Sequence, residues 1–252
     1  MSVRVSLGAR TTYTGRGGAR TDKDMIRYVR QKLGLLLINI IRMRHGVVIF
    51  YGERERARIL DTIARVRRER KLLLSDHEAY QLFMIVQKVA HVEGDIAEVG
   101  TYQGVSSKLI AEARGNSSEK HIYLFDTFEG LPALSDIDRS LFHEGQYVAG
   151  VEGVRQYLSS YKNISIYKGL FPDTAEPIKN KKFSLVHFDV DTYESTKNSI
   201  EFFYPRMTRG GVILSHDYIN SPGVKKAIDE YMKGKPEAIF ESSWRQCMIV
   251  KA

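Results

Sequence analysis

The sequence predicts an α/β fold in which a mostly parallel sheet is covered by helices on both faces. From Asp95 onward, short apolar runs alternate with amphipathic segments, a pattern that is typical of buried parallel strands connected by helices. Glycine or carboxylate residues follow most of these runs, at the strand ends where open α/β sheets bind ligands. The chain has 252 residues, of which 43% are hydrophobic, enough to bury one large core.

The predicted strands and helices alternate along the C-terminal part of the chain. Strand-like runs occur at 96–99, 121–125, 164–167, 183–188 and 211–214. Apolar residues recur at helical spacing in 105–113, 151–161, 192–203 and 222–232. Two further runs, 238–241 and 247–250, flank a polar segment and predict a terminal hairpin.

The first 92 residues are predicted to extend this domain, which we place at 93–252. Residues 1–22 are basic and rich in Gly, Arg and Thr, which predicts a mobile N-terminus. Residues 23–92 are predicted to form a helical extension, with helices over 22–44, over 53–71 and from about 75 to 90. Ser75 and Glu78 have the spacing of a capping box at the start of the third helix.

Charge is distributed unevenly between these two parts. Residues 1–71 hold 18 Lys and Arg against 6 Asp and Glu, whereas residues 72–252 hold 20 against 24. The basic part indicates contact with an anionic surface, substrate or partner, or else a solvated arginine-rich helix pair. Its basic residues are not interleaved with aromatic ones, so no nucleic-acid partner is expected. The apolar stretch Leu33–Ile41 is a candidate interface of a homo-oligomer.

A cytoplasmic location is expected from three features. The single cysteine, Cys247, excludes an internal disulfide and fits a reducing compartment. The start of the chain lacks the apolar core of a signal peptide. The longest apolar stretch is far shorter than the roughly 20 residues that a membrane span needs.

The first predicted strand ends in Glu98-Val-Gly100-Thr101-Tyr102-Gln-Gly104. Glycines let the chain turn tightly and let backbone N–H groups approach a ligand. A carboxylate at the strand end suits an ammonium group and would repel a pyrophosphate, unlike the dinucleotide fingerprint. The alternative is an ordinary structural turn.

Two more strand ends carry ligand-binding candidates. Asp126 lies 26 residues beyond Gly100, one βαβ step along, where an acidic residue can bind two ribose hydroxyls. Its alternative role is a helix cap. The third strand is followed by Lys168-Gly169-Leu170-Phe171, a tight turn whose apolar side chains can lie against an adenine, or an ordinary loop.

Acidic residues follow the fourth and fifth strands. Asp189 and Asp191 end the fourth, and His216 and Asp217 end the fifth. If these strands are neighbours, the carboxylates converge, and their mutual repulsion calls for a cation. Oxygen ligands suit Mg²⁺ or Ca²⁺, whereas His216 could favour Mn²⁺, Fe²⁺ or Zn²⁺. The alternative is that Asp191 caps the next helix and only one carboxylate serves the site.

The motifs of several other enzyme classes are absent from the sequence. It contains no G-x-S-x-G elbow, no H-E-x-x-H, no G-x-x-x-x-G-K-[ST] and no paired cysteines. Serine hydrolase, zincin, P-loop and dithiol chemistry are therefore not indicated.

In combination and in this order, the motifs resemble the macrocin O-methyltransferase family and, more distantly, catechol O-methyltransferases. The resemblance covers about 93–252 and rests on 96–104, 126–132, 188–196 and His216-Asp-Tyr218. It implies a Rossmann-like methyltransferase fold with a seven-stranded sheet in the order 3-2-1-4-5-7-6, strand 7 antiparallel. It also implies an S-adenosylmethionine-dependent O-methyltransferase, assisted by Mg²⁺ or another divalent cation, that acts on a hydroxyl of a sugar or another small natural product.

The resemblance also implies roles for individual residues. The cofactor would be bound by Glu98, Gly100, Thr101, Tyr102, Gly104, Ser106, Asp126, Thr127, Gly169, Leu170 and Phe171. The metal ligands would be Asp189 or Asp191, His216 and Asp217, although the family usually has Asp-Asp-Tyr where this chain has His216-Asp-Tyr218.

A sugar hydroxyl is a weak nucleophile and needs a base. Asp189 and Asp191 are candidates, and so is His143 in a loop over 135–150 that is predicted to cover the site.

Three other functions remain as alternatives. A nicotinamide-dependent oxidoreductase can share the fold, but Glu98 argues against it. A non-catalytic scaffold could be held on an anionic membrane or partner by residues 1–71. An RNA methyltransferase is disfavoured because the domain with the site is net negative.

Overall fold

The computed structural model describes residues 29, 33, 54–242 and 244–252, and Glu53–Ala252 form one compact unit. The basic N-terminus and most of the predicted helix over 22–44 lie outside the described residues, as does nearly all of the apolar stretch Leu33–Ile41. Within the described part of the chain, no helix is long and apolar enough to cross a membrane.

A seven-stranded sheet forms the centre of this unit, and its order β3-β2-β1-β4-β5-β7-β6 confirms the predicted order. Neighbouring strands from β3 to β5 are parallel, while β7 is antiparallel to both β5 and β6. The strands are β1 (Asp95–Val99), β2 (Ile122–Asp126), β3 (Ile164–Lys168), β4 (Phe183–Phe188), β5 (Met207–Ser215), β6 (Ile239–Glu241) and β7 (Cys247–Val250).

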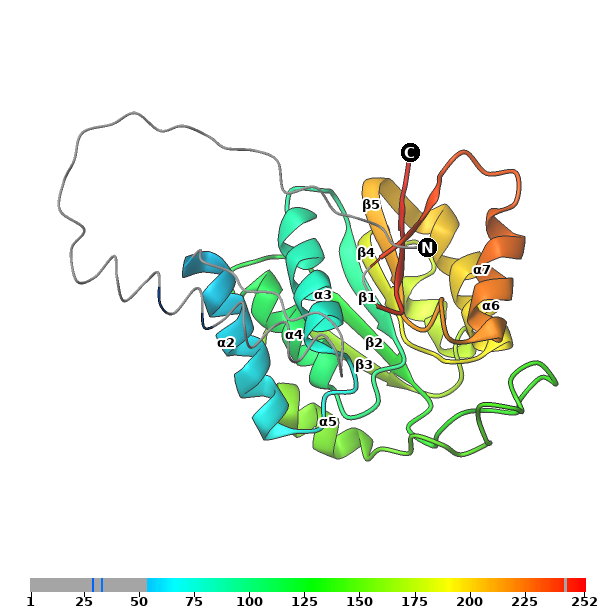
Figure 1. Cartoon of the computed structure of the whole chain (residues 1–252), viewed down its shortest axis with the longest axis horizontal. Helices are drawn as coiled ribbons and strands as arrows, with labels where there is room; N and C mark the ends of the chain where they lie inside the picture. Colours follow the sequence, from blue (N-terminus) through cyan, green and yellow to red (C-terminus); the bar gives the residue numbers. More distant parts are fainter. Residues whose placement is uncertain (1–28, 30–32, 34–53, 243) are drawn as a thin grey trace. The chain divides into compact units, whose positions relative to one another are not determined.

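Helices cover both faces of the sheet (Figure 1). One face carries α2 (Arg54–Glu69), α3 (Asp76–Lys88), α4 (Val105–Arg114) and α5 (Val151–Leu158), and the other carries α6 (Tyr193–Phe203) and α7 (Pro222–Met232). Two short 3-10 helices, η1 (Asp173–Ile178) and η2 (Tyr204–Arg206), were not predicted. Each face has its own buried apolar cluster, so the sheet is packed on both sides as its apolar strands predict.

The helices before the sheet belong to the same compact unit as the sheet. Ile63 of α2 and Leu82 of α3 are buried in one cluster with Leu109 of α4. The predicted capping box opens α3, because the Ser75 side chain accepts the backbone N–H of Glu78 while the Glu78 carboxylate accepts the N–H of Ser75. Residues 54–92 therefore support the sheet directly.

The parallel strands end at one edge of the sheet, and their pairing continues one residue further. The Gly100 N–H donates to the Phe125 carbonyl at 2.9 Å, and the Asp189 N–H donates to Val99 at 2.9 Å. His216 likewise donates its N–H to Phe188 at 2.8 Å. These bonds fix the residues that follow β1, β4 and β5 side by side, as expected for ligand-binding strand ends.

Candidate active site

A cavity of about 210 Å³ opens at this edge of the sheet. Its walls come from the ends of β1 to β5, from the first turn of α6 and from the segment between β2 and α5. We call this segment, residues 127–150, the lid. The lining residues are Leu73, Val99, Gly100, Tyr102, Phe125, Asp126, Thr127, Gly130, Leu131, Pro132, Gln146, Tyr147, Gly169, Leu170, Phe171, Asp189, Val190, Asp191, Ser195, His216, Asp217 and Arg245.

Gly100 lies at the point where the β1 and β4 ends touch. Its φ is +91°, and a Cβ at this position would lie 1.8 Å from the Asp189 carbonyl oxygen. A side chain therefore has neither the space nor the backbone conformation that it needs. The loop after β1 is thereby held against the end of β4, so the glycine-rich part and the acidic part of the cavity share a wall.

Asp126 organises the same loop through its carboxylate. It accepts the backbone N–H of Tyr102 at 2.7 Å and that of Phe128 at 2.6 Å. Burial raises the pKa of Asp126, although these backbone bonds favour the charged form and oppose the rise. Each carboxylate oxygen retains a further lone pair, so Asp126 can still accept hydroxyl donors from the cavity.

Glu98 lies one residue before the end of β1 but does not line the cavity. Its side chain is fully buried, accepts the hydroxyl of Ser107 on α4, and lies 3.0 Å from Nδ1 of His187 on β4. Side chains alternate between the two faces of a strand, and the pleat turns Glu98 toward α4. Its carboxylate therefore contributes to the support beneath the loop.

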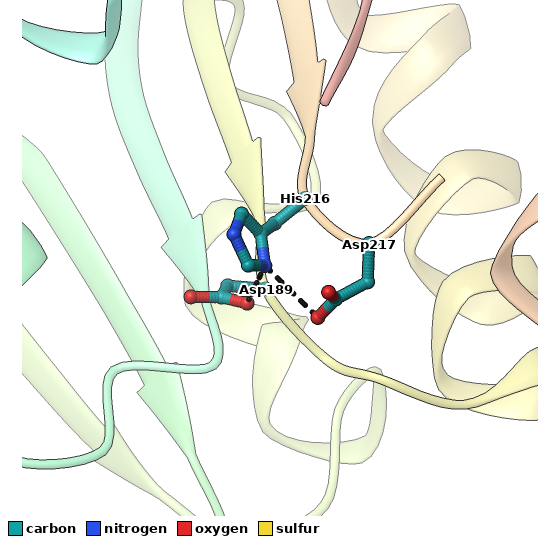
Figure 2. Close-up of side chains that lie close together, drawn as sticks. All are labelled: Asp189, His216 and Asp217. Carbon is teal, nitrogen blue, oxygen red and sulfur yellow. Dashed lines mark hydrogen bonds and ion pairs between the residues drawn. The ribbon is translucent and has the colours of Figure 1, made fainter. Parts of the chain in front are cut away.

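The acidic residues of β4 and β5 converge on His216 (Figure 2). Nδ1 of His216 lies 3.0 Å from Oδ1 of Asp189 and 2.9 Å from Oδ2 of Asp217. One ligand atom from each of the three residues lies within 4.8 Å of the other two. The strand ends therefore bring Asp189, His216 and Asp217 together, while Asp191, the other predicted ligand, is not in this group.

A third carboxylate approaches His216 from α3. Oε1 of Glu78 lies 3.2 Å from Nε2 of His216, an ion-pair distance outside hydrogen-bond geometry. Arg245 bridges the group, with Nε 3.3 Å from Glu78 and Nη1 3.5 Å from Asp217. Glu78, which completes the capping box of α3, thus also faces the site.

These carboxylates determine the protonation of the cluster. Burial lowers the pKa of His216, but the facing carboxylates of Asp189, Asp217 and Glu78 outweigh it and raise this pKa to about 12. Burial together with the nearby Asp189 and Asp217 raises the pKa of Asp191 well above its ordinary value. Burial opposes the ionisation of Asp217, yet His216 lowers its pKa to about 2. In the metal-free protein the carboxylates therefore face two cations, the His216 imidazolium and the Arg245 guanidinium.

Asp191 and Asp217 both have left-handed backbones, with φ of +62° and +57°. This conformation is uncommon outside glycine and tends to persist at functional sites. Asp191 is not the N-cap of α6, which is Thr192. Its side chain lines the cavity instead, beside Asp217.

A model of the macrocin-O-methyltransferase family (TylF) matches residues 75–239. The chain belongs to this family. Membership confirms the predicted resemblance. The match begins at the N-cap of α3 and spans most of the sheet.

Several relatives of this chain are O-methyltransferases of natural products. This chain is 28% identical over 141 residues to the 8-demethyl-8-(2,3-dimethoxy-alpha-L-rhamnosyl)-tetracenomycin-C 4'-O-methyltransferase of Streptomyces olivaceus, and the match covers 50% of this chain and 54% of that protein. It is 26% identical over 156 residues to the mycinamicin III 3''-O-methyltransferase of Micromonospora griseorubida, covering 56% and 61%. The chain thus spans little more than half the length of these curated relatives.

Solved structures confirm the fold. The O-methyltransferase NovP superposes with a TM-score of 0.64 at 22% identity, covering 72% of this chain and 82% of that one. CalS11, a calicheamicin methyltransferase, gives 0.60 at 18% identity, covering 80% and 94%. At these identities the likeness establishes the Rossmann-like methyltransferase fold alone.

In this family member, the predicted site residues divide into two groups. Eleven line the cavity: Gly100, Tyr102, Asp126, Thr127, Gly169, Leu170, Phe171, Asp189, Asp191, His216 and Asp217. Thr101, Gly104 and Ser106 are buried at the loop and the start of α4, while His143 is exposed in the lid beside the Glu144 carbonyl. Like Glu98, these four do not line the cavity.

Sequence reasoning missed several residues that the fold brings to the site. From the sequence, Glu78 was assigned only to the capping box of α3, and the segment with Arg245 only to the terminal hairpin. Leu73, Leu131, Pro132, Gln146 and Tyr147 also line the cavity without having been predicted. Leu131 and Pro132 belong to the motif 126–132 that carries the resemblance, and Gln146 and Tyr147 to the loop over 135–150 that was predicted to cover the site, but no role was predicted for these four residues individually.

Proposed function

We propose that this protein is an S-adenosylmethionine-dependent O-methyltransferase that acts on a sugar hydroxyl of a natural product. The observation that carries the proposal is the shared cavity, which is lined both by the glycine loop with Asp126 and by the adjoining acidic cluster. Family membership supports methyl transfer. The printed activities of the relatives, which include a rhamnosyl-tetracenomycin 4'-O-methyltransferase, support a sugar acceptor.

The cofactor fits the half of the cavity at the ends of β1, β2 and β3. In the proposal, its methionine end lies at Gly100 and Tyr102, and its ribose hydroxyls donate to Asp126. The adenine lies beside Thr127 and the turn Gly169–Phe171, where Leu170 is 45% exposed and free to cover a ring. Glu98, Thr101, Gly104 and Ser106 act by holding this loop and the start of α4. Two structures of the same fold, an O-methyltransferase from Bacillus cereus in complex with SAH and TomG from Streptomyces achromogenes in complex with SAM, support the choice of cofactor.

The acceptor fits the other half, beside the acidic cluster. The methyl group of a sulfonium is already activated, so the protein mainly aligns oxygen, carbon and sulfur, which can contribute roughly 7–11 kcal/mol. Asp191 is our first candidate for the base, because it lines the cavity and its pKa is raised by burial and by the neighbouring carboxylates, which increases its affinity for the acceptor proton. Asp189 is the second, and His143 stays a sequence prediction that would need the lid to move.

The donor set fits a divalent cation. Ligands around a small cation at about 2.1 Å lie about 3 Å apart in octahedral geometry, which matches the spacing of His216 Nδ1 from the Asp189 and Asp217 oxygens. Glu78 on the far side of the ring resembles the carboxylates that orient metal-bound histidines. A bound cation would lower the pKa of the acceptor hydroxyl. One nitrogen and two oxygen donors favour Mn²⁺, Fe²⁺ or Zn²⁺ over Mg²⁺.

The remaining predictions are also part of this proposal. A cytoplasmic location, a homo-oligomer and an anionic contact of residues 1–71 are compatible with the enzyme. The scaffold, the nicotinamide enzyme and the RNA methyltransferase are less favoured, because none of them needs the convergence of Asp189, His216 and Asp217.

Calorimetric titration of S-adenosylhomocysteine into the metal-stripped protein, repeated with Mg²⁺ and Mn²⁺, tests the proposal. Micromolar binding is expected, together with Mn²⁺ binding by the loaded protein. If S-adenosylhomocysteine binds equally well with and without metals and no metal binding is detected, the metal part of the proposal is wrong and the methyltransferase part stands. No binding of S-adenosylhomocysteine under any condition would overturn the methyltransferase proposal and favour the scaffold.

A further inference from the structure

Backbone hydrogen bonds join the two arms of the lid, and its tip is attached to the opposite wall of the cavity. Its two arms pair through Leu131, whose N–H donates to Gln146 at 2.8 Å and whose carbonyl accepts from Gly145 at 2.9 Å. Residues of these arms line the cavity on one side, while Asp191 and Ser195 line it on the other. In Figure 1 the lid is the green segment that extends past the strand ends between β2 and α5. Its tip, residues 133–144, is held by a separate contact with α6.

Asp138 holds the tip through a carboxylate that is only 1% exposed. The carboxylate accepts the backbone N–H of Tyr193, at 3.1 Å and 3.3 Å to its two oxygens, and the hydroxyl of Ser135 at 2.5 Å. The Asp138 carbonyl also accepts the N–H groups of Leu141 and Phe142. A buried carboxylate is costly unless it is bonded in this way, so the position is a specific attachment.

The partner of Asp138 is the first N–H of α6. The N-cap of this helix, Thr192, makes no side-chain capping bond, and its hydroxyl donates to the Ser195 hydroxyl instead. Asp138 therefore provides the missing acceptor from 55 residues away. A carboxylate at a helix N-terminus also gains from the helix dipole.

The start of α7 is shaped around the same carboxylate. Gly223 lies in the first turn of α7, and a Cβ at this position would lie 2.0 Å from Oδ1 of Asp138. Because the φ of Gly223 is not in the left-handed region, backbone conformation does not explain the glycine. A side chain is excluded here because the Asp138 carboxylate occupies the space that it would need.

The contact between Asp138 and α6 is next to the turns that carry the acidic cluster. Tyr193 follows Asp191 by two residues, and the Ser221 hydroxyl donates to the Asp191 carbonyl at 2.9 Å. The Ser221 N–H donates to the carbonyl of Asp217 at 2.8 Å. The turns that carry Asp191 and Asp217 are therefore bonded to each other at the place where the lid tip docks.

From this arrangement we infer that Asp138 is a positioning residue, a latch that holds the lid over the cavity and ties its closure to the turns of Asp191 and Asp217. The inference rests on the proposed function for its consequence: the latch retains the bound cofactor and keeps water out. Release of the latch opens the lid without removing any group that touches the cofactor.

Asp138→Asn tests the latch, because it keeps the size of the side chain but removes its charge and one acceptor. Trypsin cleavage after Arg139, which is exposed in the lid tip, is expected to become about tenfold faster, the effect of losing one charge-assisted hydrogen bond. S-adenosylhomocysteine is expected to bind about tenfold more weakly and to dissociate faster. Asp61→Asn is the matched control, because it removes the same charge from an exposed position on α2, away from the lid and from Arg139, and it should change neither result.

Two further variants separate the latch from general destabilisation. Ser135→Ala removes one donor to Asp138, and Gly223→Ala displaces Asp138 from the α7 side. Both are expected to speed cleavage after Arg139 before other sites are cut, since global unfolding would expose all sites together. Asp138→Glu restores the charge and should recover part of the affinity.

The outcomes distinguish this inference from the proposed function. If wild type binds S-adenosylhomocysteine and Asp138→Asn changes neither affinity nor cleavage after Arg139, the latch is overturned. If wild type binds no S-adenosylhomocysteine, the proposed function fails, while the cleavage measurement still decides whether Asp138 holds the lid.

Discussion

The two halves of the cavity are built in different ways. At the ends of β1 and β2, the cavity is shaped mainly by backbone groups. Gly100 allows the close approach of two strand ends, and the Asp126 carboxylate accepts two backbone N–H groups. At the ends of β4 and β5, side chains from separate elements crowd around His216. The first half is a preorganised cradle. The second is a charged cluster whose protonation depends on what it binds, so the two halves should respond differently to mutation.

Gly100→Ala is expected to have the largest effect, because it forces the two halves apart. The added Cβ would lie 1.8 Å from the backbone of Asp189, and a backbone cannot move aside cheaply, so a loss of more than about 3 kcal/mol of stability is expected. Urea unfolding and calorimetry with S-adenosylhomocysteine measure it. Gly115→Ala is the control, since Gly115 also has a positive φ but nothing within 4 Å. Equal losses in both variants would show that φ alone, and not the contact, matters.

Asp217→Asn should affect the acidic half alone. Removal of a charged ligand is expected to weaken Mn²⁺ binding by more than about 100-fold, beyond the effect of losing an outer-shell partner. S-adenosylhomocysteine affinity should stay within about threefold, because Asp126 and the glycine loop are untouched. Electron paramagnetic resonance and calorimetry measure the two affinities. A parallel loss of both would mean that the halves are not separable.

Glu78→Gln tests the charge of the cluster through acid stability. Burial opposes the ionisation of Glu78, but His216 lowers its pKa from 4.5 to about 2. Its stabilisation is therefore present above pH 4.5 and is lost as the pH falls toward 2. The His216 contribution, with a raised pKa, is lost only as the pH rises toward 12, so it does not mask the acid side.

In metal-free protein, the free energy of unfolding from urea titrations at several pH values should therefore fall less steeply below pH 4.5 in Glu78→Gln than in wild type. The difference at neutral pH should be about 2 kcal/mol. Parallel acid limbs in the two proteins would contradict the assigned pKa of Glu78.

Lys168→Ala should have the smallest effect, although Lys168 ends β3 beside the cofactor half. Its ion pair with Glu129 is 2.9 Å long but exposed, at 48% and 75% of the two side chains. Exposed pairs contribute about 0–1 kcal/mol, so S-adenosylhomocysteine affinity should change less than about twofold in calorimetry. A tenfold loss would indicate that Lys168 contacts the cofactor directly.

The fold was largely predictable because its signals are local. Apolar runs, helical spacing and the Ser75–Glu78 capping box located most elements to within a few residues, and the resemblance supplied the strand order. The 3-10 helices η1 and η2 were missed, since short turns of this kind have no periodic pattern to detect.

The site was predictable only where residues follow a strand. Asp126, Asp189, His216 and Asp217 were found because strand ends meet at one edge. Glu98 follows the same rule in sequence, yet the pleat turns its side chain toward α4. Glu78, Asp138 and Arg245 gave no signal of their own, because their partners are distant in sequence.

The parallel sheet, the glycine loop and the acidic strand ends were predictable from local sequence, because hydrophobic periodicity and strand-end chemistry act over a few residues. Which carboxylates meet depends on the packing of elements that are distant in the chain. Folding brings Glu78 from α3 to His216 and Asp138 from the lid to α6, contacts across 138 and 55 positions of the chain. Burial and opposite charge hold these contacts together, and both exist only once the elements have packed.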